Sequence, residues 1–493
     1  MHAIILCAGM SQRFRPVSYA IPKPLVPIEG VPLVERSIAM LHDSGITDIT
    51  IITGYLDEKY EYLKEKHHIE LVYNDRYAEC NNWTSLFMVR DRLDDALIID
   101  GDLVFLENFV SLVQSGKSQF ISQPTRHGLE WQMLLNAECR IEAIHKWKPD
   151  GYGLVGLSYW QGEAARMLAE ELEQCTPEDY WEDAAIRIIE KTPVYATCVE
   201  RTFLYELDTL KDALHFHLLT HEEIAHLSSH DYKPQKLKGL TNNTWKIRGH
   251  DGAMWCLRIP GAGTEAFIDR EQEPVVISFI ENLGVTPSTV FYPHGLKTCT
   301  FLEGYRIATA EDMTRPFFDA LASLLKRLHS VPFPASCPFP PMYLKSQIEL
   351  YEAQSGILAE PELRDWLMEK AAFFDASAPV LCHRDLLLEN ILFQEGEYST
   401  TQLIDFEYAG FTHPLWDSAS FILEADLADA PRKQFIESMK LDEDGAAHLL
   451  WMEILVDYVW GMWGLVNRYA DYAENRLKRS RLKFYALKRA GSG

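Results

Sequence analysis

The chain has 493 residues, which is too long for one typical domain, so we expect two or more hydrophobic cores. Its formal net charge of −25 argues against a nucleic-acid ligand, because phosphate backbones are bound by clustered Lys and Arg. A hydrophobic content of 47% is ordinary for a soluble protein. The nine cysteines contain no Cys-x-x-Cys pair, and reduced thiols in a cytoplasmic protein are the simplest interpretation.

Predicted strands and helices alternate along the first half of the chain. We expect strands at residues 2–6, 46–53 and 96–99, and helices at 34–43 and 58–66. This alternation predicts an α/β fold with a doubly wound sheet and right-handed crossovers. Ligands of such sheets bind beyond the carboxyl ends of the strands, where the turn at Ala8 and the carboxylate of Asp102 are expected.

The second half has a different pattern. The α/β alternation ends near residues 205–208 and a helical stretch follows to about Leu227. Segment 228–238 is polar and contains Pro234, so we take it as a linker between domains 1–227 and 239–493. The second domain is expected to consist of a small sheet followed by a large helical lobe.

The expected elements of the second domain are two hairpin strands, at 244–247 and 254–259, and mainly helices from Met313 onward. The most apolar helix candidate, 449–466, is interrupted by Glu453 and Asp457. It is expected to be buried in the protein, and we predict no membrane span.

The first motif that carries chemistry follows the first predicted strand. The turn Ala8-Gly9-Met10-Ser11 allows backbone N–H groups to approach phosphate oxygens closely. Arg13 and Lys23, the latter within Pro22-Lys23-Pro24-Leu25, can offset the charge of a triphosphate. Together these residues predict a nucleoside-triphosphate site.

This motif resembles the N-terminal signature of the nucleoside-triphosphate transferases, Ala-Ala-Gly-x-Gly-x-Arg followed by Pro-Lys. The chain departs from it at Cys7, which replaces the first Ala, and at Ser11, which stands where a second Gly is common. The closer resemblance, over about residues 1–225, is to the bacterial phosphocholine cytidylyltransferases. It rests on short segments at 54–56, 60–64, 73–74, 99–102 and 205–208.

The resemblance implies that Asp102 is a magnesium ligand and that Lys23 contacts the reacting phosphate. It places the second metal carboxylate within 180–183, at Glu182, with Asp183 as the alternative, since the family usually has Asp where this chain has Glu182. Such ligands suit nucleotidyl transfer, in which Mg2+ and Lys neutralise charge as pyrophosphate leaves. Further candidates are aromatic walls for a choline head group and polar side chains that read the base or ribose: Trp131, Tyr152, Tyr180 and Trp181, and Asn81, Asn82 and Ser85.

The second motif is His383-Arg384-Asp385 with Asn390 five residues after the Asp, followed by Ile404-Asp405-Phe406-Glu407. Asp385 can accept a proton from an attacking hydroxyl, and Asn390 and Asp405 can bind magnesium against the phosphates of ATP. These are the parts that the protein-kinase template requires, in the required order.

Upstream residues complete this template. Segment 239–243, which includes Asn242 and Asn243, is expected to be a loop that covers the nucleotide. Arg258 takes the place of the strand lysine of protein kinases. Its expected ion-pair partner is Glu273 on the following helix, with Glu271 as the alternative.

This half resembles the choline and ethanolamine kinases, relatives of the aminoglycoside phosphotransferases, over about residues 236–480. The resemblance rests on segments 257–261, 403–410, 414–417 and 460–463, and it implies a two-lobed, protein-kinase-like fold. It also implies a cage for a quaternary ammonium, built from Trp460 and Trp463 on one helix face, with three residues nearby: Glu407, Trp416 and Asp417. The Trp-rich setting favours choline over ethanolamine, and relatives usually carry Asn or Gly where Arg384 stands.

We therefore predict a bifunctional enzyme. Its C-terminal domain phosphorylates choline with ATP, and its N-terminal domain joins phosphocholine to CMP from CTP, both with Mg2+. Two alternatives stay open. One replaces the N-terminal substrate by aminoethylphosphonate or phosphoethanolamine, with an amino-alcohol kinase. The other makes one domain a degenerate binding or regulatory module.

Overall fold

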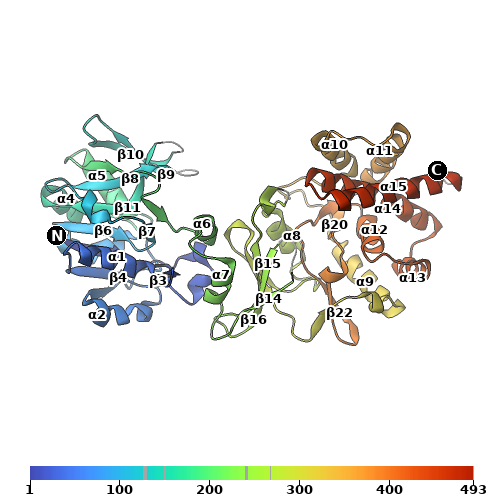
Figure 1. Ribbon diagram of the computed structural model, residues 1–493, viewed down its shortest axis with the longest axis horizontal. Coiled ribbons are helices and arrows are strands. Elements are labelled where there is room, and N and C mark those ends of the chain that lie inside the picture. Colours follow the sequence, from blue (N-terminus) through green and yellow to red (C-terminus); the bar gives the residue numbers. More distant parts are fainter. Residues whose placement is uncertain (126–129, 149–150, 239–241, 267, 492–493) are drawn as a thin grey trace. The chain divides into compact units, whose positions relative to one another are not determined.

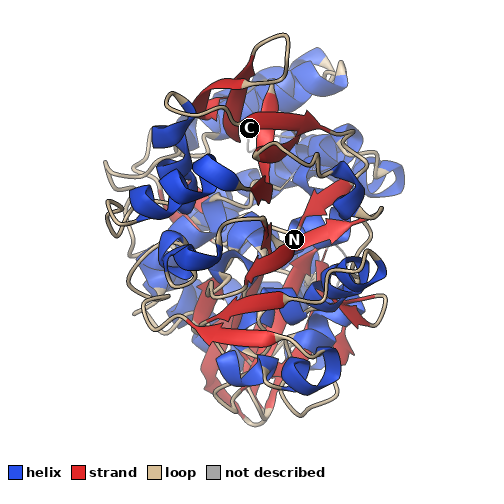
Figure 2. Cartoon of the chain, turned by 90° about the vertical axis from the view of Figure 1, so that its left-hand side faces the viewer, coloured by secondary structure: helices blue, strands red, loops and turns tan. Residues whose placement is uncertain are grey.

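The computed structural model describes residues 1–125, 130–148, 151–238, 242–266 and 268–491. Its contacts divide the chain into two units, the first comprising 1–235 and 247–253 and the second comprising 236–246 and 254–493. Figure 1 follows the chain from the N-terminus in blue to the C-terminus in red. Figure 2 colours its helices blue and its strands red.

The first unit is built on a mixed nine-stranded sheet with the order β10-β9-β11-β6-β1-β4-β5, in which β8 pairs with β11 and β12 pairs with β8. Strands β5, β4, β1 and β6 are parallel, and β11 joins β6 antiparallel. The strands are β1 (His2–Leu6), β4 (Ile49–Thr53), β5 (Glu70–Tyr73), β6 (Ala96–Asp100), β8 (Gln119–Pro124), β9 (Glu130–Leu135), β10 (Ile141–Lys148), β11 (Tyr152–Trp160) and β12 (Tyr195–Cys198).

Helices cover both faces of this sheet. Successive side chains of β1 point to opposite faces, so Ala3 and Ile5 enter one core cluster while Ile4 and Leu6 enter the other. The first cluster contains residues of α1, and the second contains residues of α3, α4 and α5. A parallel strand buried on both faces reads as a continuous apolar run, which explains the sequence of β1. The helices are α1 (Leu33–Asp43), α2 (Tyr62–His67), α3 (Trp83–Phe87), α4 (Gly162–Leu172) and α5 (Trp181–Ile189).

The expected α/β architecture of this unit is confirmed, with local differences. The helix expected at 58–66 is divided into a 3-10 turn at Asp57–Tyr60 and the short α2. The strand expected at 46–53 begins at Ile49. The small strands β7 (Leu103–Phe105) and β13 (Leu204–Glu206) pair antiparallel outside the main sheet. Helices α6 (Leu210–His215) and α7 (His221–Leu227) follow β13.

The second unit begins with a five-stranded sheet of order β14-β15-β16-β18-β17. The strands are β14 (Gln235–Leu237), β15 (Asn242–Arg248), β16 (Met254–Pro260), β17 (Thr289–Phe291) and β18 (Lys297–Thr300), and α8 (Gln272–Ile280) follows β16. Strand β14 falls within the segment that we expected to be a linker. Of the expected nucleotide-covering loop, residues 239–241 lie outside the described residues, whereas Asn242 and Asn243 belong to β15.

A helical lobe follows, as expected, with two small strand sets inserted in it (Figure 1). Its helices are α9 (Arg315–Leu328), α10 (Leu344–Ser355), α11 (Pro361–Asp375), α12 (Leu415–Glu424), α13 (Asp429–Met439), α14 (Glu443–Val466) and α15 (Ala470–Arg489). The inserted strands are β19 (Tyr305–Ile307), β21 (Ile391–Gln394) and β22 (Glu397–Leu403), and the pair β20 (Val380–Cys382) and β23 (Gly410–Thr412). The motifs His383–Asp385 and Ile404–Glu407 lie on the turns after β20 and β22.

Helix α14 contains the apolar stretch at 449–466. Among the described residues it is the one helix long and apolar enough to cross a membrane, and 72% of its apolar 18-residue stretch is buried inside the protein. The two acidic residues of the apolar stretch are paired: Glu453 with Arg432 and Lys483, and Asp457 with Arg476. Burial with charge pairing agrees with the expected core helix.

Candidate active sites

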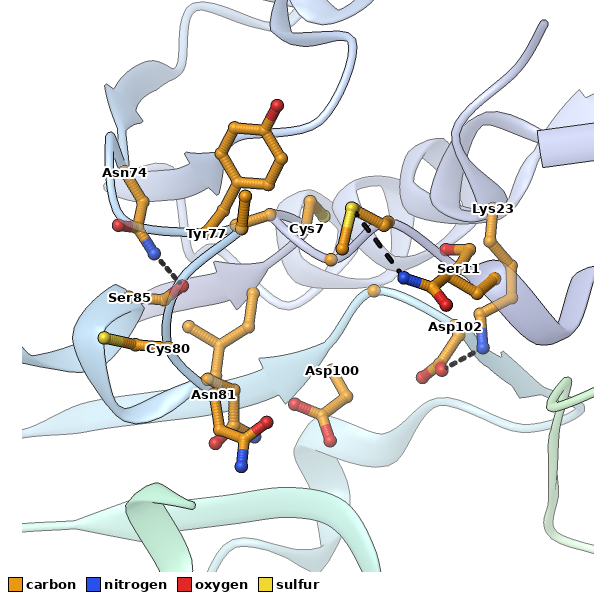
Figure 3. Close-up of a pocket in the computed structure, with 18 of the residues that line it drawn as sticks. Cys7, Ser11, Lys23, Asn74, Tyr77, Cys80, Asn81, Ser85, Asp100 and Asp102 are labelled. Atoms are coloured by element: carbon orange, nitrogen blue, oxygen red, sulfur yellow. Dashed lines mark hydrogen bonds and ion pairs between the residues drawn. The ribbon is translucent and has the colours of Figure 1, made fainter. Parts of the chain in front are cut away.

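A cavity of about 700 Å³ lies at the carboxyl ends of β1 and β6 in the first unit (Figure 3). The turn Ala8–Ser11 forms one part of its wall, as expected for a ligand of an α/β sheet. Ser11 has φ 50°, in the left-handed region that favours glycine, which explains why relatives often carry Gly there. Its carbonyl accepts a hydrogen bond from the Ser18 hydroxyl at 2.8 Å, which holds the turn.

Lys23 and Asp102 meet inside this cavity. Lys23 is 7% exposed, and its Nζ lies 2.6 Å from Oδ2 of Asp102 and 4.0 Å from Oδ1 of Asp208. Arg13 donates to the same Asp208 oxygen at 2.6 Å. The two cations predicted from the sequence therefore converge on carboxylates, and Figure 3 shows the Lys23–Asp102 pair.

The group of carboxylates around Lys23 differs from the predicted one. Ligand oxygens of Asp102, Glu206 and Asp208 lie within 4.8 Å of one another. Burial, followed by the charges of Asp208 and Asp102, raises the pKa of Glu206 to about 8. Burial lowers the pKa of Lys23, but Asp102 and Asp208 raise it more, so that it lies above its usual value. Acids crowded in this way gain from a bound cation, and carboxylate oxygens are the ligands that Mg2+ prefers, so the donor set fits magnesium.

Glu182, the expected second metal carboxylate, and its alternative Asp183 lie at the start of α5 and outside that group. Asp183 accepts from the backbone N–H of Tyr180 at 3.0 Å and pairs with Lys146 at 2.5 Å. The Oε2 atom of Glu182 is buried without a hydrogen-bond partner, and burial raises the pKa of Glu182 to about 7. Burial and the charge of Glu182 also raise the pKa of Asp100, a cavity residue. The charge of Glu182 thus acts on Asp100, whereas Asp102 is grouped with Glu206 and Asp208.

The predicted aromatic walls lie in three different settings. Tyr180 lines the cavity, and its ring meets that of Trp131 edge-on with centroids 5.6 Å apart. The ammonium of Lys146 lies 4.3 Å from the centroid of the Trp131 ring, so this face already attracts a cation. Trp181 is 1% exposed and packs on Phe120 in the core, so we reassign it to packing. Tyr152 is 41% exposed at the start of β11.

The three polar residues expected to read the base or ribose all line the cavity: Asn81, Asn82 and Ser85. Asn81 donates to the carbonyl of Glu178 at 2.7 Å, and Asn82 accepts from the backbone N–H of Trp181 at 3.0 Å. Ser85 accepts from Asn74 at 2.9 Å (Figure 3). These bonds orient the wall opposite the Ala8–Ser11 turn.

In the second unit, the turn after β20 carries Asp385. Burial, followed by the charges of Asp405 and Glu407, raises the pKa of Asp385 to about 7. Asn390 donates to the carbonyl of Asp385 at 2.9 Å, so its side-chain amide is fixed toward the same turn. The carboxylate of Asp405 and the amide oxygen of Asn390 are donors of the chemistry that Mg2+ takes, so this pair also fits magnesium.

Asp417 holds the turn that carries Asp385 in place. It is fully buried, and its carboxylate accepts from the backbone N–H of His383 at 2.9 Å and of Arg384 at 2.7 Å. The ring of His329 lies 2.9 Å from the same carboxylate. We had expected Asp417 near the head group, and the structure instead assigns it to positioning the turn.

Arg384 and Trp416 form the support beneath that turn. Arg384 has φ 69°, which explains why relatives prefer Gly or Asn at this position. Its guanidinium lies 4.5 Å from the centroid of the Trp416 ring, and the indole N–H of Trp416 donates to the Arg384 carbonyl at 3.0 Å. Trp416 is fully buried, so it too supports the turn and offers no exposed face for a cage.

Arg258 is the centre of a buried ion network. It pairs with Glu273, as predicted, and donates to Asp405 at 2.7 Å. Lys297 makes a second ion pair with Glu273 at 2.5 Å. Glu407, expected near the head group, lies in this network and accepts from Arg270 at 2.9 Å and from Asn242 at 3.1 Å. Glu271 precedes α8 as its N-cap residue.

Aromatic rings gather near the turn that carries Asp385: the ring centroids of Trp416 and Trp460 lie 6.5 Å apart, and Trp416 donates to the carbonyl of Arg384. Trp460 and Trp463 of α14 meet edge-on with centroids 5.4 Å apart, and Tyr408 meets Trp460 in the same way at 5.3 Å. Tyr469 stacks on Trp463 with centroids 5.5 Å apart. Burial raises the pKa of Tyr408, and the charges of Glu407 and Asp385 raise it further. Tyr408 and Tyr469 were missed in the sequence, although Tyr408 directly follows the Asp405-Phe406-Glu407 motif.

Comparisons with known proteins match the two halves separately. Residues 3–161 match the MobA-like NTP transferase domain, and residues 235–449 match the phosphotransferase enzyme family. A choline-phosphate cytidylyltransferase from Streptococcus pneumoniae is 32% identical over 217 residues, which are 43% of this chain and 95% of the relative. A 2-aminoethylphosphonate cytidylyltransferase from Lancefieldella rimae is 30% identical over 44% of this chain and 91% of its own length.

Among solved structures, a choline kinase from Streptococcus pneumoniae aligns with 54% of this chain and 97% of its own, with a TM-score of 0.44 and 22% identity. The match covers 95% of the length of the Streptococcus pneumoniae cytidylyltransferase, and the motifs that follow β1 and β6 line the cavity. Together they establish the family of the N-terminal half. Through that half the chain belongs to the cytidylyltransferases among the MobA-like NTP transferases, and its C-terminal half is a kinase domain of the phosphotransferase enzyme family.

Proposed function

We propose that this chain makes CDP-choline in two steps. The C-terminal domain transfers the γ-phosphoryl group of ATP to choline, and the N-terminal domain transfers CMP from CTP to the resulting phosphocholine with release of pyrophosphate. The observation that carries the proposal is the cluster of Tyr408, Trp460 and Trp463, which packs through Trp416 against the turn that carries Asp385. A trimethylammonium group has no N–H to donate, so aromatic faces and nearby carboxylates are its available attraction.

In the first step Asp385 accepts the proton of the choline hydroxyl as the oxygen attacks the γ-phosphorus. A base with a pKa of about 7 is matched to that task at neutral pH. Asn390 and Asp405 would hold one magnesium ion and Asp102 with Asp208 another, and a bound ion would neutralise charge on the phosphate oxygens. Asp417 keeps the backbone of the catalytic turn aligned throughout.

In the second step a phosphate oxygen of phosphocholine attacks the α-phosphorus of CTP. Lys23 and Arg13 stabilise the negative charge that grows on the phosphates and on the leaving pyrophosphate. No covalent intermediate on the protein is needed. Trp131 and Tyr180, with Asp100 and Glu182 close by, would bind the head group. The Oε2 atom of Glu182, which has no hydrogen-bond partner, would attract the positive charge of the head group.

A second candidate is favoured by the relative that acts on 2-aminoethylphosphonate and by the carboxylates near Tyr180. A primary ammonium has three donors, which Asp100, Glu182 and Asp183 could accept. Competition decides between them: phosphocholine, phosphoethanolamine and 2-aminoethylphosphonate are offered together with CTP and Mg2+, and the products are identified by mass spectrometry. CDP-choline in clear excess supports the proposal, and excess of the phosphonate product contradicts it.

The two-step proposal is tested with choline, ATP, CTP and Mg2+ supplied to the full chain. We expect phosphocholine first and CDP-choline after it. The variant Asp385→Ala should form neither from choline, yet should convert added phosphocholine as the wild type does. Loss of both activities in the folded variant would contradict two independent active sites, and a wild type without either activity would support a regulatory module.

A further inference from the structure

Two cysteines face each other across the sheet of the second unit. Strands β16 and β18 are antiparallel, and their register pairs Cys256 with Cys299. Directly opposed Cα atoms of antiparallel strands lie about 4.5–5.5 Å apart, and disulfides span Cα distances of about 4.4–6.8 Å. Both residues are half-buried, so a disulfide between them requires an oxidant as small as hydrogen peroxide. Backbone spacing therefore permits a bond without rearrangement of the strands' register.

The two thiols already interact. A hydrogen bond between them, together with burial, raises the pKa of Cys256. The same bond lowers the pKa of Cys299, and the charges of Lys297 and Arg258 lower it further against the opposing effect of burial. The thiolate is the reactive form of cysteine, so Cys299 is the thiol prepared to react and Cys256 is its neighbour.

These cysteines share a sheet face with the cations of the kinase site. Residues two apart on a strand point to the same face, so Cys256 lies beside Arg258, and Cys299 lies beside Lys297. Arg258 and Lys297 both hold Glu273, and Arg258 also reaches Asp405. A change in the separation of β16 and β18 at the cysteines is therefore passed to the groups that position ATP.

We propose that Cys256 and Cys299 are a site of reversible disulfide formation that switches off phosphoryl transfer by the C-terminal domain. With hydrogen peroxide as oxidant, the Cys299 thiolate breaks the O–O bond and becomes a sulfenic acid as hydroxide leaves. The sulfur of Cys256 then attacks that sulfur and water leaves, so two thiols and one peroxide give one disulfide and two waters. The bond draws the Cβ atoms to about 3.8 Å and displaces Arg258.

The covalent test uses the full chain treated with peroxide and digested with trypsin without reduction. Cys256 lies in the tryptic peptide 249–258 and Cys299 in 298–306, as set by the flanking Arg and Lys residues. We expect these two peptides joined, with the loss of two hydrogens, and separated again by dithiothreitol. Absence of the joined pair at peroxide levels that oxidise other thiols would overturn the proposal.

The functional test compares the two activities of one preparation and rests on the proposed function. Oxidation should lower choline phosphorylation at least about tenfold, since a misplacement of about 1 Å can cost roughly 100-fold. Conversion of phosphocholine with CTP should be unchanged, and dithiothreitol should restore the kinase. Cys256→Ser and Cys299→Ser should keep kinase activity after oxidation, whereas the control Cys337→Ser should lose it as the wild type does.

Joined peptides with undiminished phosphorylation would overturn the switch, and so would equal inactivation of Cys256→Ser. If the reduced protein phosphorylated no choline, the proposed function would fail instead. The peptide map and the rise in unfolding temperature caused by ATP would then still test the disulfide, because a displaced Arg258 should diminish that rise in the oxidised protein only.

Discussion

Glu273 is the residue whose replacement tests the kinase site most directly. It is 1% exposed and holds the two cations Arg258 and Lys297. Burial raises its pKa, but Lys297 and Arg258 lower it more, from 4.5 to about 2. At 1.36 kcal/mol per pKa unit, that fall corresponds to about 3 kcal/mol of stabilisation of the carboxylate. Removing one partner of a buried ion pair costs about 3–5 kcal/mol, which agrees.

We therefore expect Glu273→Gln to lower the unfolding free energy of the C-terminal domain by about 3 kcal/mol, because two buried cations lose their counter-charge. In a domain of this size that corresponds to a fall of roughly 6–12 °C in the midpoint of thermal unfolding. Scanning calorimetry of the full chain measures it, and ATP and CTP identify the transitions of the two domains. The N-terminal transition and CTP-dependent activity should not change.

The pH dependence gives an independent check. The pKa of Glu273 is lower in the folded state, so its contribution is fully present above about pH 4.5 and is lost as the pH falls toward 2. The difference between wild type and Glu273→Gln should therefore shrink on acidification. Adding Lys297→Met to the variant should recover part of the loss, because one unpaired buried cation is removed. An unchanged C-terminal transition at pH 7 would refute the reasoning.

Three further outcomes are expected. Asp208→Asn should lower kcat/KM for cytidylyl transfer, measured by pyrophosphate release, at least about 100-fold, because the loss of a metal-binding carboxylate costs several kcal/mol. Glu182→Gln should mainly raise KM for phosphocholine. The reverse pattern would indicate that Glu182 binds the metal. Asp385→Asn should lower kcat for choline phosphorylation by about 10²–10⁴ while ATP still raises the unfolding temperature, and a mild loss would exclude Asp385 as the base. Burial and the nearby His448 and His329 lower the pKa of His413 from 6.5 to about 4. Between about pH 4 and 6.5 the unfolded state therefore binds more protons than the folded state, and the unfolding free energy rises with pH by up to about 3 kcal/mol. Urea denaturation at several pH values should show a flatter pH dependence for His413→Gln, and an equal slope would contradict this prediction.

Local patterns carried much of the fold and part of each site. The apolar run of β1 predicted a buried parallel strand because residues adjacent in sequence determine both faces of one strand. Lys23 and Asp102 were found from short motifs, and the structure brings them to 2.6 Å. The pair Arg258–Glu273 also followed from the sequence, since a strand and the helix after it are neighbours.

The remaining members of each site depend on how distant segments meet. Asp208 is separated from Asp102 by about half of the first unit, and the pairing of β13 with β7 brings them together. Spacing in the sequence does not predict this contact. Burial in the folded chain decided the roles of Trp181 and Trp416. The sequence of a motif does not show whether an aromatic ring in it is exposed to a ligand or packed in the core.

The sequence by itself therefore identified the candidate residues of both proposed sites: a nucleotide turn with a lysine and an aspartate, and an aspartate proposed as the base with its asparagine and second aspartate. Those groups act from contiguous motifs, whose geometry is set by a few backbone angles. The tertiary structure alone decided which carboxylates share a cation, that Asp417 holds the catalytic turn, and that Cys256 faces Cys299. The reason is physical, since strand order and burial arise from the packing of the whole chain.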